Sequence, residues 1–142
     1  MLIVLDTNVL VSGLINPFGA PARVLDQITL TTVRVAFDDR ILDEYHEVLS
    51  RPLFDFSPAN VRALLDHIVL NGVHVVPEPM VESSVPDPGD LPFAEVAVAV
   101  RVDCLVTGNL KHFVSIEKLN VPVLTPAEFL DGLRRMLDEG SK

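Results

Sequence analysis

The sequence is poor in cysteine and contains no tryptophan or long apolar run. Its one cysteine, Cys104, cannot form a disulfide within the chain, and a lone thiol is typical of a reducing compartment. No apolar segment approaches the roughly 18 residues of a membrane span. Residues 1–5 are apolar, but Asp6 interrupts them and no basic segment precedes them, so we expect no signal peptide. These absences predict a cytoplasmic protein.

Positive charge is also scarce. The 142 residues include 11 Lys and Arg against 20 Asp and Glu, which gives a formal net charge of −9. A nucleic-acid-binding protein that relies on a basic groove carries the opposite balance. The composition therefore excludes a basic groove, and any affinity for nucleic acid must have another origin.

What is present is the composition of one globular domain. Hydrophobic residues make up 49% of the chain and charged residues 22%, which is too apolar for a disordered protein. A chain of roughly 150 residues buries about two-thirds of its unfolded surface without disulfides. We expect a single domain over residues 1–137 and a flexible tail over residues 138–142.

Short apolar segments alternate with longer segments of helical periodicity. Strands are predicted at 2–5, 33–37, 73–76, 104–106 and 121–124, and helices at 8–15, 22–30, 38–49, 58–70, 93–102 and 126–137. A long Pro-rich segment, 77–92, separates the third strand from the next helix. Alternating strands and helices predict a three-layer α/β/α fold with a parallel sheet, because the crossover helices cover both faces.

Polar residues follow two of the predicted strands directly. Asp6, Thr7 and Asn8 come after the first strand, and Thr107 and Asn109 come after the fourth. A helix cap explains one polar residue at such a place. Three in a row favour a site, since ligands of parallel sheets bind beyond the carboxyl ends of the strands.

Further acids come from the intervening segments. Glu44 lies beside the apolar stripe of its predicted helix, where it is either a solvated charge or a carboxylate that needs a partner. Asp87 and Asp90 flank a Pro-Gly turn, and taken alone they are better explained as a turn residue and a helix cap than as site residues. Oxygen ligands gathered at one sheet edge suit Mg²⁺ or Mn²⁺, which in turn suits metal-assisted hydrolysis at phosphorus.

Six segments, spread over nearly the whole chain, match one known family: LDTNVLVSG at 5–13, DEYHEVLSRP at 43–52, DPGDLPFAEVAVA at 87–99, VDCLVTGN at 102–109, KHF at 111–113 and VPVLTPAEFL at 121–130. This is a resemblance to the PIN-domain family. It implies a five-stranded parallel sheet and an Mg²⁺- or Mn²⁺-dependent ribonuclease, of the kind found as VapC-like toxins in prokaryotic toxin–antitoxin pairs. Such a toxin is expected to act on RNA, to have a small antitoxin protein as partner and to form a homodimer.

The resemblance also assigns roles to individual residues. Asp6, Glu44 and Asp90 match the three catalytic and metal-binding acids, and Asp87 matches a further acid of one subgroup. Asn109 stands where many members have an Asp, and the missing charge favours one metal ion over two. The supporting residues are Thr7, Asn8 and Thr107, and Lys111 and His112 are candidates for contact with RNA.

Two other functions stay open on the sequence. The first is an aspartyl-phosphate phosphatase or receiver with Asp6 as nucleophile. Asn8 argues against this hypothesis, because such phosphatases need a second Asp at that position. The second is a non-catalytic binding module that retains the fold. Under the nuclease hypothesis several of the acids bind metal, so the charge of −9 predicts weak, metal-dependent RNA binding instead of excluding it.

Overall fold

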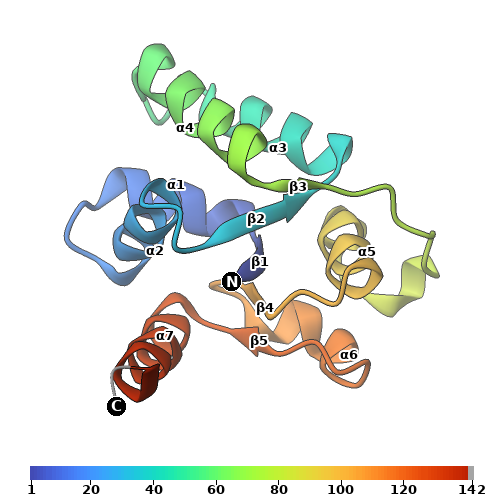
Figure 1. Ribbon diagram of the computed structural model, residues 1–142. Coiled ribbons are helices and arrows are strands. Elements are labelled where there is room, and N and C mark those ends of the chain that lie inside the picture. The colour runs from blue at the N-terminus through green and yellow to red at the C-terminus, as the bar shows by residue number, and fades with distance from the viewer. Residues whose placement is uncertain (141–142) are drawn as a thin grey trace.

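The sheet lies at the centre of the molecule and is entirely parallel. In the computed structural model, which describes residues 1–140 except the side chain of Ser83, its strands follow the order β3-β2-β1-β4-β5 (Figure 1). The strands are β1 (Leu2–Leu5), β2 (Arg34–Phe37), β3 (Val73–His74), β4 (Cys104–Val106) and β5 (Val123–Leu124). The predicted five-stranded parallel sheet is therefore confirmed.

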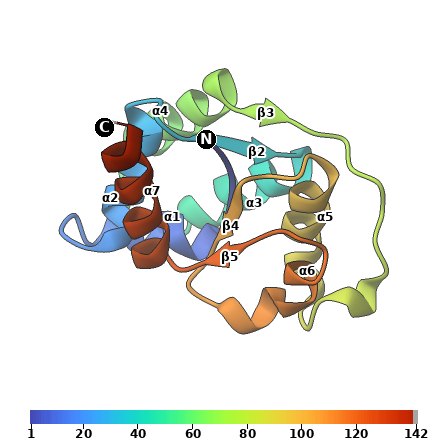
Figure 2. The ribbon, with the colours of Figure 1, turned by 60° about the horizontal axis from the view of Figure 1, so that its bottom comes forward.

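Helices cover both faces of this sheet. They are α1 (Thr7–Ile15), α2 (Ala20–Thr29), α3 (Asp39–Leu49), α4 (Pro58–Asn71), α5 (Leu91–Ala99), α6 (Val114–Glu117) and α7 (Pro126–Gly140), with the 3₁₀ turns η1 (Glu82–Ser84), η2 (Pro88–Asp90) and η3 (Leu110–Phe113). Helices α5 and α6 lie on one side, and α2 and α7, which contact each other, lie on the other (Figures 1 and 2). This is the predicted three-layer arrangement.

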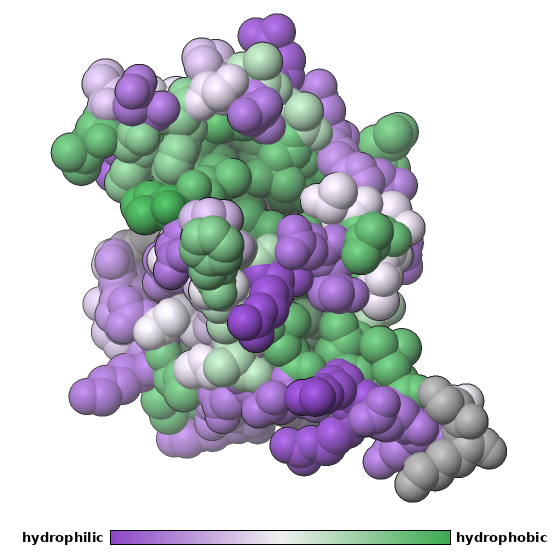
Figure 3. Space-filling model, turned by 90° about the vertical axis from the view of Figure 1, so that its left-hand side faces the viewer, coloured by the Kyte–Doolittle hydropathy of each residue, from purple (hydrophilic) through white to green (hydrophobic). Residues whose placement is uncertain are grey.

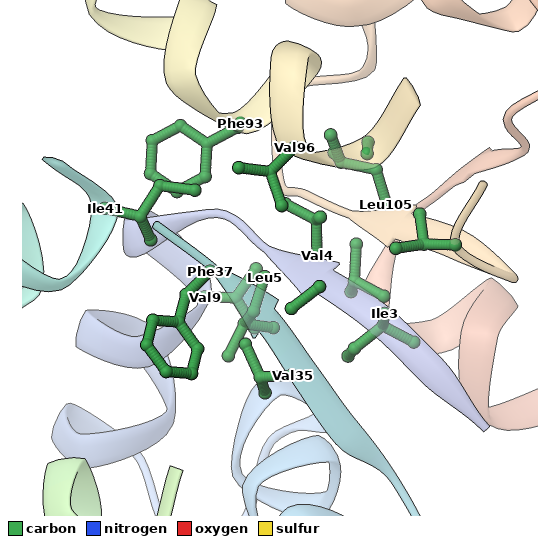
Figure 4. Close-up of a cluster of buried hydrophobic side chains, with 14 of the residues drawn as sticks. Ile3, Val4, Leu5, Val9, Val35, Phe37, Ile41, Phe93, Val96 and Leu105 are labelled. Atoms are coloured by element: carbon green, nitrogen blue, oxygen red, sulfur yellow. The ribbon is translucent and has the colours of Figure 1, made fainter. Parts of the chain in front are cut away.

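The central strand is buried on both faces. Ile3, Val4 and Leu5 have no exposed surface, which explains why β1 is a continuous apolar segment without alternation. Figure 4 shows Val4 directed toward Val96 of α5, in the layer opposite to the one that holds α1. Burial of this kind, at about 25 cal/mol per Å² of apolar surface, is the main source of stability.

Several elements differ from the sequence prediction. Residues 110–117 form η3 and α6, where no element was expected; these turns are too short to show helical periodicity, and the burial of Phe113 and Ile116 fixes them to the core. Helix α7 continues to Gly140 because residues 137–139 contain no glycine or proline, so the expected tail is helical as far as the structure describes it. Residues 141–142 of that tail lie outside the described part.

The buried carboxylate of Glu95 holds the Pro-rich segment against the core. Glu95 on α5 accepts a hydrogen bond from the Met80 backbone N–H at 2.6 Å and pairs with the Arg40 guanidinium at 2.7 Å. The same guanidinium lies 2.6 Å from Asp38, whose side chain caps α3 by accepting from the Ile41 N–H. These contacts fix the path of the chain that leads to Asp87 and Asp90.

None of the helices within residues 1–140 is both long and apolar enough to cross a membrane.

Candidate functional site

Asp6 lies where the direction of chain connections reverses. Strand β1 pairs with β2 on one side and β4 on the other, which makes its carboxyl end the topological switch point of the sheet. The Asp6 backbone N–H donates to the Val106 carbonyl at 3.0 Å. Its side chain is 7% exposed, makes no capping bond to α1, and accepts a hydrogen bond from the Thr107 hydroxyl at 2.7 Å.

Glu44 reaches the same edge from α3. Its carboxylate accepts a hydrogen bond from the hydroxyl of Thr7, the first residue of α1, and it is half-buried. The next residue, Tyr45, is fully buried and donates its hydroxyl to the Leu5 carbonyl at 2.5 Å. Tyr45 thus ties α3 to the end of β1 and sets the position of Glu44 relative to Asp6.

Asp90 stands at the start of α5 without capping it through its side chain. Its carboxylate instead lies 2.7 Å from Nδ1 of His112, which comes from η3 on the far side of the site. Asp87 is exposed and accepts the Gly89 N–H at 2.9 Å, so it closes the η2 turn as the simpler interpretation of the sequence expected.

The three acids line one open depression of about 430 Å³. Its walls come from α1, α3 and the η2 turn, and the residues around it are Asp6, Thr7, Asn8, Val11, Ser12, Glu44, Val48, Arg51, Gly89 and Asp90. Asp87, Asn109, Lys111 and His112 are not among the lining residues. The depression is therefore acidic, with Arg51 as the cation at its rim.

Burial and mutual repulsion raise the pKa values of these three carboxylates. Burial raises the pKa of Asp6 above its ordinary value of 3.8; the Thr107 hydrogen bond opposes this and the charge of Asp90 adds to it. Burial likewise raises the pKa of Glu44, against the Thr7 hydrogen bond and with the help of the Asp6 charge. Burial raises the pKa of Asp90 too, and the bond to His112 opposes the rise.

The loop after β4 is tied to the start of α1. The Gly108 N–H donates to the Asn8 side-chain oxygen at 3.3 Å, and the Asn109 N–H donates to the Thr107 hydroxyl at 2.9 Å. The Asn109 side chain is exposed and has no hydrogen bond to any described residue. Asn109 is therefore joined to the site through its backbone N–H, which contacts Thr107, and not through its side chain.

The donor chemistry fits a hard divalent cation. Three carboxylates with raised pKa values face one depression, and a cation there would offset their repulsion. As the side chains of residues 1–140 are placed, however, no three His, Cys, Asp or Glu residues surround one point that would hold a metal ion. The three carboxylates thus fit a divalent cation in their chemical type and in their place on one depression.

Three features of this region were not predicted from the sequence. His112 was predicted only as a candidate RNA contact, and in the structure its ring lies 2.7 Å from the Asp90 carboxylate. The pairing of the buried Glu95 with Arg40 was not expected, although a charged residue inside an apolar helix is a signal of such pairing. Arg51 was not among the predicted site residues, and its place at the rim depends on how α3 packs.

The fold and the site define a parallel α/β protein with an acidic ligand site at the switch point of its sheet. Comparison with known proteins identifies the family. The model of the PIN domain matches residues 2–111, so the chain belongs to the PIN-domain family. The PIN domain is a nuclease fold. The uncharacterized protein MJ1680 of Methanocaldococcus jannaschii is 28% identical over 145 residues, an alignment that covers 95% of this chain and 93% of that protein.

Proposed function

We propose that this protein is a metal-dependent endoribonuclease that hydrolyses RNA phosphodiester bonds with Mg²⁺ or Mn²⁺ as cofactor. The observation that carries the proposal is the convergence of Asp6, Glu44 and Asp90 on one open depression at the switch point of the sheet. An open depression suits a polymeric substrate, which must enter and leave along its length.

The three carboxylates are the groups that would hold the cation. The chemistry that such an ion supplies when bound is polarisation of the phosphodiester and compensation of the charge on the leaving oxygen. Asp6 is the deepest of the three and is held by Thr107. Glu44 and Asp90 are less buried than Asp6, so either carboxylate is the more accessible group to hold or deprotonate an attacking water.

Cleavage of labelled RNA in Mn²⁺ or EDTA tests this proposal. We expect cleavage by the wild type in Mn²⁺ and none in EDTA, and we expect Asp6→Asn to abolish it. The exposed Asp131 on α7 provides a matched control, since Asp131→Asn removes the same charge away from the depression. Wild-type rates for Asp6→Asn would refute the assignment, and release of phosphate from a phosphomonoester without RNA cleavage would favour the phosphatase.

We further propose that the protein acts as the toxin of a toxin–antitoxin pair. The acidic depression has the charge that would accept an arginine inserted by a small antitoxin protein. Phe18, on the connection between α1 and α2, is 84% exposed and supports a homodimer formed through this part of the surface. The antitoxin proposal is tested by looking for a small reading frame beside this gene and by measuring whether its product inhibits RNA cleavage. Sedimentation of the purified protein tests the homodimer.

A further inference from the structure

A second pocket of about 430 Å³ adjoins the acidic depression. It lies between the end of α3, the connection that follows and the start of α4, and it is lined by His46, Leu49, Ser50, Arg51, Pro52, Asp55, Phe56, Pro58, Val61 and Arg62. We call it the α3–α4 pocket. Its volume is within the range of about 300–1,000 Å³ typical of small-ligand sites.

Cationic groups outnumber acids in the α3–α4 pocket, although the chain as a whole carries a charge of −9. Two arginines line it against one acid, Asp55. Arg51 is already paired with Glu47, at 2.8 Å and 3.1 Å. Arg62 is exposed, and its guanidinium makes no ion pair or hydrogen bond with any residue in the described part of the chain. Arg62 is therefore the cation available to an anionic ligand.

The pocket also has an aromatic wall. Phe56 lines it and stacks on Phe54, with ring centroids 5.3 Å apart and ring planes inclined by 10°. Both residues are partly buried and keep some exposed surface. Figure 3 shows apolar side chains gathered in the upper part of one face, level with α4, while the lower part is more hydrophilic. A flat, partly exposed ring beside a free guanidinium suits a nucleotide, whose base stacks on aromatic rings.

The two hollows are neighbours that share one lining residue. Arg51 lines the α3–α4 pocket and also the depression that holds Asp6, Glu44 and Asp90. Because the same side chain borders both hollows, a strand whose scissile phosphodiester lies against the carboxylates would place an adjoining nucleotide toward the α3–α4 pocket.

We infer that the α3–α4 pocket binds a nucleotide of single-stranded RNA next to the cleaved phosphodiester, with Arg62 on its phosphate and Phe56 against its base. The inference rests on the proposed ribonuclease function. It also gives an acidic protein a local source of RNA affinity, because a short basic and aromatic surface replaces the basic groove that the composition excludes.

Binding of a fluorescent single-stranded decanucleotide RNA tests the inference, with Ca²⁺ in place of Mn²⁺ so that binding is measured without turnover. Arg62→Gln is expected to weaken binding about tenfold and to reduce the slope of log affinity against log salt by about 0.7, the loss of one phosphate contact. Phe56→Leu is expected to weaken binding about tenfold through loss of stacking. Arg135→Gln on α7 removes the same charge far from the pocket and is expected to bind as the wild type does.

Cleavage kinetics in Mn²⁺ distinguish this inference from the proposed function. We expect Arg62→Gln to raise KM about tenfold with a smaller effect on kcat, since Arg62 does not line the acidic depression. If Arg62→Gln weakens binding but the wild type cleaves no RNA, the pocket stands and the ribonuclease proposal fails. If the wild type cleaves RNA and Arg62→Gln matches Arg135→Gln, the pocket inference is overturned and the pocket becomes a candidate protein contact. Absence of binding by the wild type also overturns it.

Discussion

Replacement of Thr107 by valine tests how the site is held together. The Thr107 hydroxyl is fully buried, donates to Asp6 at 2.7 Å and accepts the Asn109 N–H at 2.9 Å. Valine has nearly the same shape, so the substitution removes both hydrogen bonds without opening a cavity. The two polar partners then lose the group that satisfies them.

The expected loss of stability follows from these two bonds. A hydrogen bond to a charged group contributes about 1.5–3 kcal/mol, and an unsatisfied, partly buried N–H costs about 1 kcal/mol more. Burial of the added methyl returns up to about 1 kcal/mol. We therefore expect the free energy of unfolding to fall by about 2–3 kcal/mol at neutral pH, and Tm to fall by about 6–12 °C for a chain of this size.

The effect of this substitution depends on pH. The pKa of Asp6 in the folded protein is raised above 3.8, its ordinary value. Between pH 3.8 and this higher pKa, the native state therefore binds more protons than the unfolded state. Stability from this group is present below pH 3.8 and is lost as the pH rises through the folded pKa. Because the Thr107 bond lowers that pKa, its removal raises the pKa further, and the deficit of the variant is larger at pH 7 than near pH 3.8.

Urea unfolding between pH 4 and pH 8, without divalent metal, measures both effects. Thr107→Ser is the matched control, because it keeps the hydroxyl and loses only a methyl, at a cost of about 1 kcal/mol. Equal midpoints for the valine and serine variants would refute the reasoning. So would a valine deficit that does not change with pH.

Two further predictions concern buried groups outside the depression. Glu95→Gln places an amide N–H₂ against either the Met80 N–H or Arg40, so one of the two hydrogen bonds is lost. We expect the free energy of unfolding in urea to fall by about 1–3 kcal/mol and proteolysis within residues 77–90 to become faster. The exposed Glu78 provides the control variant, Glu78→Gln, and equal proteolysis of the two variants would contradict the prediction. Burial raises the pKa of Cys104 to about 12, so thiol reagents at pH 8 are expected to label it only at the rate of unfolding. Immediate labelling of the native protein would contradict that expectation.

The strand ends show how far local sequence predicts this site. Asp6, Thr7 and Asn8 follow an apolar strand, and the rule that parallel strands present their carboxyl ends at one edge was enough to bring them near Thr107. Glu44 was ambiguous from its helix alone. Its neighbour Tyr45 belongs to the buried stripe, and the hydrogen bond from Tyr45 to the Leu5 carbonyl decides which way that side of α3 faces.

The sequence by itself determined the layers, the parallel sheet and the set of acids near its edge, because these depend on apolar periodicity and on residues adjacent to strands. The tertiary structure alone decided the partners of those acids. His112 is 22 residues from Asp90 and Thr107 is 101 residues from Asp6, and no local pattern encodes such a pair. The same holds for Arg51, whose place between the acidic depression and the α3–α4 pocket follows from the packing of α3 against α1 and α4.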